Sequence, residues 1–114
     1  MTDDFENLIE KIFSSDAKNI LAFGNFGIEK ESLRIYQSEI SMQKHQKSMG
    51  SSLCHKYITT DFSEAQLELI TPPFADKKIG LDFLDNIHHF VSHKINDEII
   101  WPFSIPPLIQ PDSK

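Results

Sequence analysis

The first residues of the chain alternate between apolar and polar in the rhythm of an amphipathic helix. Apolar side chains recur at intervals of three and four, which predicts a helix over residues 3–13. The apolar positions of this helix are Phe5, Leu8, Ile9, Ile12 and Phe13. Polar turn residues follow at 14–19. The composition then becomes strand-like, interrupted by Gly24 and Gly27, and predicts a strand over about residues 20–36.

A second strand is predicted over about residues 64–71 by strict alternation. Glu64, Gln66 and Glu68 fall on one face of this strand, and their apolar neighbours fall on the other. The two prolines at 72–73 end it, because proline has no N–H to donate to a sheet. The pattern is typical of a half-buried strand with an acidic outer row.

The longest periodic segment predicts a helix over residues 76–96, with Asp76 as its N-cap. Its apolar stripe consists of Ile79, Phe83, Ile87, Phe90, Val91 and Ile95. Residues 38–52 read as a long loop with a short strand near Ile40, and residues 98–114 as a proline-studded extended tail. These elements predict one α+β domain over residues 1–114, with a helix packed on a small sheet.

Composition narrows the classes of function. The chain has 114 residues, and its 17 acidic residues against 11 Lys and Arg give a net charge of −6. This balance argues against a nucleic-acid partner or a basic membrane-surface module. A single cysteine permits neither an internal disulfide nor a cysteine-based zinc site. The N-terminus does not resemble a signal peptide, and no segment approaches the roughly 20 apolar residues of a membrane span. We therefore expect a soluble, cytoplasmic protein.

The acidic residues of the two strands suggest a cation site. Glu29 and Glu31 share one face of the first strand, as Glu64 and Glu68 share one face of the second, with Asp61 just upstream. If these strands are neighbours, their like charges destabilise the sheet. A divalent cation would turn this repulsion into attraction. The alternative is that the carboxylates form a solvated outer face.

Three other features are better explained by a structural role than by a catalytic or ligand-binding role. His89 and His93 have the i, i+4 spacing of metal ligands, but they lie off the apolar stripe and outside any H-E-x-x-H frame. Gly24 and Gly27 lack the frame of a phosphate-binding loop, which favours a turn. Cys54 has no base suitably placed to activate it as a nucleophile. We expect no catalytic residue among them.

Three stretches of the chain together resemble the proteobacterial type of glutamate–cysteine ligase. They are FGIEKESLRI, MGSSLCHKYITTDFSEAQLELITPP and DEIIWPFSIPP. The resemblance runs from about Phe23 to Ile105 and is most specific in the TTDFSEAQLELITP run. It implies that the chain is the N-terminal segment of a longer ligase. It also implies a fold similar to glutamine synthetase, whose antiparallel sheet holds acidic metal ligands on its concave face.

The resemblance also implies a reaction and a set of ligands. In that family, ATP phosphorylates the γ-carboxylate of L-glutamate, and the amine of L-cysteine then displaces the phosphate, which is the first step of glutathione biosynthesis. Mg²⁺ (or Mn²⁺) neutralises the charge that develops. Residue-by-residue matching places Glu29, Glu31, Asp61 and Glu68 on the family's metal-binding acids and leaves the role of Glu64 open.

The same resemblance assigns no catalytic residue to this chain and leaves its nucleotide-binding residues unknown, because the downstream part of the family supplies most contacts to the nucleotide and the amino acids. We therefore expect the 114-residue chain to be inactive alone. The alternative is a stand-alone, non-catalytic module from a truncated gene that binds a divalent cation or a protein partner. Exposed strand edges and the apolar tail would then favour self-association. Whether the coding sequence continues in frame beyond Lys114 distinguishes the two.

Overall fold

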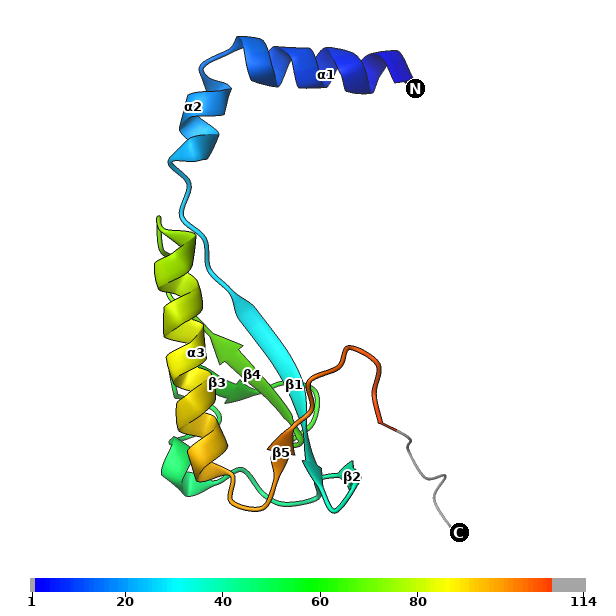
Figure 1. The fold of residues 1–114 in the computed structure, drawn as a ribbon, viewed down its shortest axis with the longest axis vertical. Helices are drawn as coiled ribbons and strands as arrows, with labels where there is room; N and C mark the ends of the chain where they lie inside the picture. Colours follow the sequence, from blue (N-terminus) through cyan, green and yellow to red (C-terminus); the bar gives the residue numbers. More distant parts are fainter. Residues whose placement is uncertain (1, 108–114) are drawn as a thin grey trace.

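A computed structural model describes residues 2–107 of the chain. Figure 1 labels the elements in chain order. They are α1 (Thr2–Ser14), α2 (Ala17–Ala22), β1 (Glu29–Tyr36), β2 (Glu39–Ile40), the 3-10 turn η1 (Lys47–Met49), β3 (Ile58–Thr60), β4 (Gln66–Ile70), α3 (Lys77–Lys94) and β5 (Ile99–Ile100).

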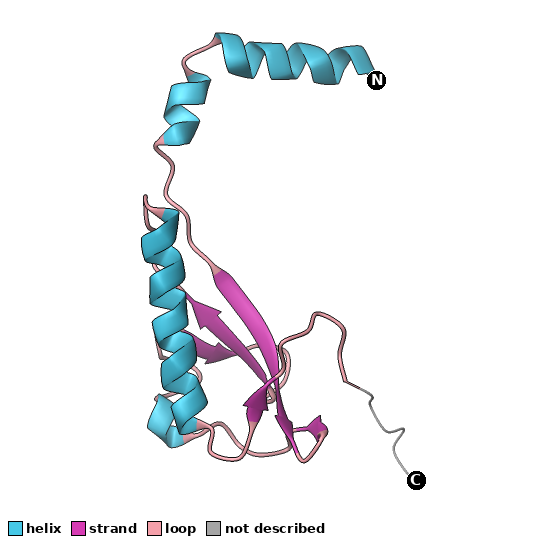
Figure 2. Cartoon of the chain, in the orientation of Figure 1, coloured by secondary structure: helices cyan, strands magenta, loops and turns pink. Residues whose placement is uncertain are grey.

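The strands form one antiparallel sheet with β1 at its centre (Figure 2). The N-terminal half of β1 pairs with β4, and β4 pairs on its other side with β3. The C-terminal end of β1 pairs with the two-residue strands β2 and β5. Every pairing is antiparallel, so the predicted α+β class with an antiparallel sheet is confirmed.

Helix α3 runs along one face of the sheet and builds the core with it (Figure 1). Asp76 caps this helix as predicted, because its carboxylate accepts a hydrogen bond from the N–H of Lys78 at 2.8 Å. The buried core residues are Met49, Ile58, Leu67, Leu69, Ile87, Val91 and Ile95. Two members of the predicted stripe, Ile79 and Phe90, stay exposed. The core therefore uses the middle and C-terminal turns of α3.

The strand predicted over about residues 20–36 begins only at Glu29, so its first part is wrong. Residues 17–22 form the short helix α2 instead, followed by an irregular segment. Ala17, Lys18 and Ala22 are good helix formers, and a short apolar run such as 20–23 does not distinguish a helix from a strand by periodicity. The acidic part of the predicted strand is unaffected.

Helices α1 and α2 form an arm that stands away from the sheet and α3 (Figure 1). None of the described side chains of α1 and α2 is buried. The apolar face predicted for the first helix exists, but Phe5 and Phe13 on it are 65% and 63% exposed. The helix that the amphipathic pattern predicts is therefore present, but its apolar face is not buried.

The remaining predictions concern loops and the tail. The short strand expected near Ile40 is β2, and the loop after it contains η1, which buries Met49. Strand β3 was not foreseen as a separate element. The predicted tail contributes β5, and its residues 108–114 lie outside the described part of the chain. Across residues 2–107, no helix combines the length and apolar character that crossing a membrane requires.

Candidate functional site

The register of the sheet brings carboxylates from two strands together. Glu31 on β1 lies directly opposite Glu68 on β4, and Thr59 on β3 lies opposite Glu68 on the other side. Side chains of directly opposed residues share a face, so these three form a line across the sheet. Leu67 and Leu69, which alternate with Glu68, are buried on the opposite face with α3. The two acidic strands are therefore neighbours, which is the condition on which the expected cation site depends.

Neutral donors connect these carboxylates. The side-chain amide of Gln66 donates to Oε2 of Glu31 at 2.8 Å and to Oδ2 of Asp61 at 3.3 Å. The hydroxyl of Thr59 donates to Oε2 of Glu68 at 3.0 Å. Gln66 thus links an acid of β1 to the acid that precedes β4. We call Glu29, Glu31, Asp61 and Glu68 the acidic row.

Glu29 and Glu64 are placed differently from the other acids. Glu29 begins β1 and faces Ile70 across the β1–β4 pair, at the far end of the row. Glu64 belongs to the turn before β4, because the strand begins at Gln66. Its Oε1 accepts a hydrogen bond from the backbone N–H of His45 at 2.8 Å. Glu64 is therefore directed to the loop after β2 and does not join the row.

No basic side chain neutralises the acidic row within residues 2–107, where the ion pairs involve other residues. In the same part of the chain, no three Asp, Glu, His or Cys side chains are gathered closely enough to enclose a metal ion. Mg²⁺ commonly takes only one or two protein carboxylates and completes its shell with water and substrate phosphates. The opposed pair Glu31 and Glu68 fits that partial requirement, with oxygen donors of the right kind.

A small hollow lies beside the row. It has a volume of about 240 Å³ and is bordered on one side by Glu31 and Gln66. Its other wall comes from the segment after β5, through Trp101, Phe103, Ser104 and Pro106. A ligand in this hollow would touch both the carboxylate of Glu31 and an aromatic wall.

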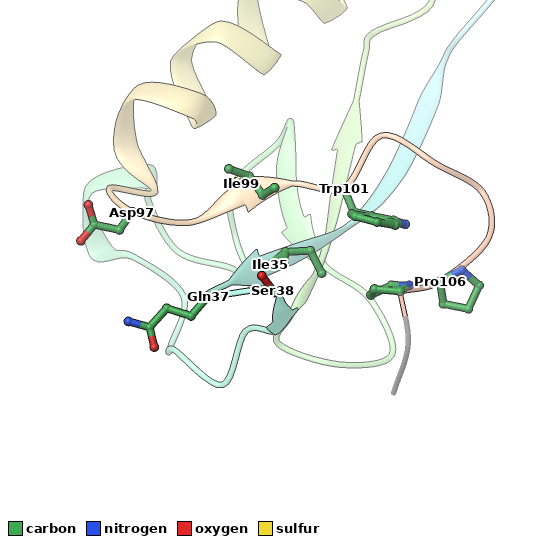
Figure 3. A pocket seen from close by; sticks show the side chains of 8 residues that line it. Ile35, Gln37, Ser38, Asp97, Ile99, Trp101 and Pro106 are labelled. Carbon is green, nitrogen blue, oxygen red and sulfur yellow. The ribbon is translucent and has the colours of Figure 1, made fainter. Parts of the chain in front are cut away.

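A larger groove adjoins this hollow at Trp101 and Pro106 but lacks the acids of the row (Figure 3). It has a volume of about 580 Å³ and a mainly apolar lining. Its lining residues are Ile35, Gln37, Ser38, Asp97, Ile99, Trp101, Pro106 and Pro107. An apolar groove of this kind offers little to phosphate or to a hard cation, so the smaller hollow is the better candidate site.

The histidine and cysteine candidates stay outside the site. His89 and His93 are exposed on α3, and Nε2 of His89 lies 3.5 Å from a carboxylate oxygen of Asp85. Cys54 is exposed and free. The placement of the two histidines agrees with the solvated helix face expected from the sequence.

Sequence reasoning missed the two neutral donors of the site. Gln66 was placed on the acidic face but received no role, and Thr59 was not singled out. The signal for Gln66 was available, since a polar residue between two acids on one strand face is positioned to donate to both. Thr59 could be recognised only once β3 was known to pair with β4.

Comparisons with known proteins agree on one family. The family model described as "Glutamate-cysteine ligase" matches residues 9–114. A glutamate–cysteine ligase of Alcanivorax borkumensis is 43% identical over 109 residues, which covers 95% of this chain and 21% of the relative. A "Glutathione biosynthesis bifunctional protein" of Desulfotalea psychrophila is 38% identical and covers 91% of this chain and 13% of the relative.

A solved structure extends the comparison to the fold. The glutamate–cysteine ligase of Francisella tularensis in complex with AMP superposes with a TM-score of 0.73 at 33% identity. The match covers 77% of this chain and 18% of that structure. The chain thus spans about a fifth of the length of the glutamate–cysteine ligases that it matches.

Proposed function

This chain belongs to the glutamate–cysteine ligase family, and we propose that its acidic row is a divalent-cation site of an ATP-dependent glutamate–cysteine ligase. The observation that carries the proposal is the pairing of Glu31 with Glu68, joined to Asp61 through Gln66. Opposed like charges cost stability in a sheet unless something compensates them. A bound cation supplies that compensation, and ATP is the partner that brings one.

In the proposed reaction, ATP transfers its γ-phosphoryl group to the γ-carboxylate of L-glutamate. The amine of L-cysteine then attacks the acyl carbon and releases phosphate, which leaves γ-glutamylcysteine. When bound, Mg²⁺ (or Mn²⁺) neutralises negative charge on the phosphates. The carboxylates of the acidic row, Glu29, Glu31, Asp61 and Glu68, would supply protein ligands to such ions, with the pair Glu31 and Glu68 at the centre. Gln66 and Thr59 would orient Glu31, Asp61 and Glu68 by the hydrogen bonds that they donate.

We assign this chain the role of a cation-binding segment rather than that of a complete catalyst. It holds an opposed carboxylate pair and the hollow beside it, whereas the ligases that it matches are about five times longer. We propose that the isolated chain binds Mg²⁺ weakly, does not catalyse ligation, and functions in the cytoplasm, where ATP is available. Cysteine-dependent release of phosphate from ATP and L-glutamate by the purified chain would contradict this assignment.

A chimera tests the proposed function directly. Residues 9–114 replace the matching segment of the Alcanivorax borkumensis ligase, which is 43% identical over 109 residues. We expect cysteine-dependent phosphate release that requires Mg²⁺ or Mn²⁺. The matched variants are Glu31→Gln on the row and Glu39→Gln on β2, which remove the same charge at different places. A folded chimera that stays inactive, or one equally active in both variants, would reject the proposal.

A further inference from the structure

A buried arginine lies beneath the acidic face and makes contact with three separate parts of the chain. Nη1 of Arg34 donates to Oε1 of Glu98 at 2.6 Å. Nη2 donates to the backbone carbonyls of Gln43 and Glu64, both at 2.7 Å. Ser41 donates from its hydroxyl to the same oxygen of Glu98. One guanidinium therefore joins the loop after β2, the turn before β4 and the segment before β5.

Burial of this group is complete. The side chains of Arg34 and Glu98 are both 0% exposed. Nε of Arg34 and Oε2 of Glu98 have no hydrogen-bond partner within residues 2–107. A buried ion pair with unsatisfied atoms is a weak contributor to stability, because desolvation offsets the attraction between the charges. Stability alone is therefore a poor explanation of the network.

The network ends at the turn that presents Asp61. Arg34 holds this turn twice, through Glu64 as above and through its own N–H, which donates to the carbonyl of Ala65 at 2.7 Å. The same turn is closed by a hydrogen bond from the N–H of Asp61 to the carbonyl of Gln66 at 3.0 Å. Fixing the carbonyl of Glu64 thus fixes the relative placement of Asp61 and Gln66.

We propose that Arg34 is a positioning residue for the cation site and acts through the turn of residues 61–66. It touches neither the acidic row nor any ligand, and its contribution is to hold Asp61 and Gln66 in register with Glu31. The inference rests on the proposed function, because it needs a cation at the row. A lysine cannot replace this arginine, since one ammonium lacks the planar fork that reaches two carbonyls and a carboxylate at once.

The probe is Mn²⁺ alone, titrated into the 114-residue chain and followed by electron paramagnetic resonance. We expect Arg34→Lys to weaken Mn²⁺ binding about tenfold, which is the lower end of the loss seen when a direct partner of a metal ligand is removed, because Arg34 acts on the ligand only through the turn. A second variant, Arg34→Met with Glu98→Leu and Ser41→Ala, removes the charges and the hydroxyl together. Replacing a buried pair in this way often preserves stability, so this variant keeps the test valid if Arg34→Lys unfolds the chain.

A double-mutant cycle separates positioning from general loosening. In an Asp61→Asn background, Arg34→Lys should have a much smaller further effect on Mn²⁺ affinity, because the charged ligand that it positions is gone and only its effect through Gln66 remains. Ile87→Val is the control, since it loosens the core without touching the turn. Hydrogen exchange of the Asp61 amide gives a second readout and should become faster in both Arg34 variants but not in Ile87→Val.

The outcomes distinguish the two proposals. Mn²⁺ binding that is lost in Glu68→Gln but unchanged in both Arg34 variants overturns the positioning role alone. Equal losses of affinity with and without Asp61→Asn also overturn it. A chain that binds no Mn²⁺ at all overturns the cation site and the positioning role with it. Weakened binding found largely in the background with an intact Asp61 supports both.

Discussion

Carboxylates of the acidic row accept hydrogen bonds from neutral side chains rather than from cations. Gln66 and Thr59 supply these hydrogen bonds to Glu31, Asp61 and Glu68. A neutral donor fixes the direction of a carboxylate while leaving its charge available. An arginine in the same place would have satisfied that charge and competed with a metal ion. At the scale of single residues, the row is thus oriented by neutral donors and keeps its negative charge.

The first prediction concerns Glu68 in the chimera described above. Glu68→Gln should lower turnover by roughly a hundredfold or more, since it removes a charge that would face the transition state. The free energy of unfolding should change by less than about 0.5 kcal/mol, because Glu68 lies on the face of the sheet opposite to the buried Leu67 and Leu69 and is only half-buried there. Steady-state kinetics and chemical denaturation measure the two quantities.

Glu39→Gln provides the control for that prediction, because Glu39 is an exposed acid on β2 away from the row. It should leave both turnover and stability unchanged. If Glu68→Gln keeps full turnover while the chimera requires a divalent cation, the assignment of Glu68 to the cation site is wrong.

A second prediction at this scale concerns His88, which lies half-buried against the sheet. Burial lowers the pKa of His88 below its ordinary value of 6.5, and the charge of Lys30 lowers it further, while Asp85 acts in the opposite direction. The unfolded chain therefore binds this proton at a higher pH than the folded chain. The free energy of unfolding should consequently fall as the pH decreases below about 6.5.

His88→Gln should reduce this loss of stability between pH 7.5 and 5.5, a range above the titration of ordinary carboxylates. Urea denaturation across that range measures it. His93→Gln is the matched control, because His93 is exposed on the same helix. Burial also lowers the pKa of His45, so part of the slope should remain in His88→Gln. An unchanged slope in His88→Gln would refute the prediction.

At the scale of elements, the alternation of β4 was the most informative part of the sequence. Its pattern predicted both the buried face, with Leu67 and Leu69, and the acidic face that carries Glu68. The alternation of buried and more exposed residues predicted from the sequence is present in β4, because one face of the strand packs on α3 and the other does not. The register that places Glu31 opposite Glu68 was not predictable in the same way, since pairing between distant strands is set by the whole sheet.

Two features, one of them a helix and the other a single residue, show where local sequence patterns stop being informative. The apolar residues at 20–23 were assigned to a strand, although they lie in or next to helix α2 and remain largely exposed. Without burial, no packing selects between the two structures and local propensity decides. The burial and pairing of Arg34 were equally unpredictable. Nothing in a strand sequence indicates that an arginine will be paired with Glu98, which is 64 residues away along the chain.

The cap of α3 gives a prediction at the scale of an element. Asp76→Ala removes the hydrogen bond to the N–H of Lys78 and should lower the free energy of unfolding by about 1 kcal/mol. Chemical denaturation measures this loss. Asp76→Asn should retain most of the stability, because asparagine is an equally good cap. Equal losses in both variants would mean that the charge, rather than the cap, is important at this position.

At the scale of the whole molecule, the chain is extended. Its radius of gyration is 19.5 Å, whereas a compact domain of this length has about 13 Å. The arm of α1 and α2 accounts for much of the difference, since it stands away from the sheet and α3 (Figure 1). Its apolar residues therefore take no part in the core that holds the acidic row in place.

This arrangement gives the last prediction. Removing residues 1–23 should leave the free energy of unfolding within about 0.5 kcal/mol of that of the whole chain, because none of the described side chains of α1 and α2 is buried. Amide exchange in β1 and β4 should also be unchanged, since those strands are held by α3 and by their neighbours in the sheet. Ile87→Ala serves as the reference for a variant that damages the core, and it should lower the free energy of unfolding by about 2–5 kcal/mol. A truncated chain as unstable as Ile87→Ala would show that the arm packs on the sheet in solution.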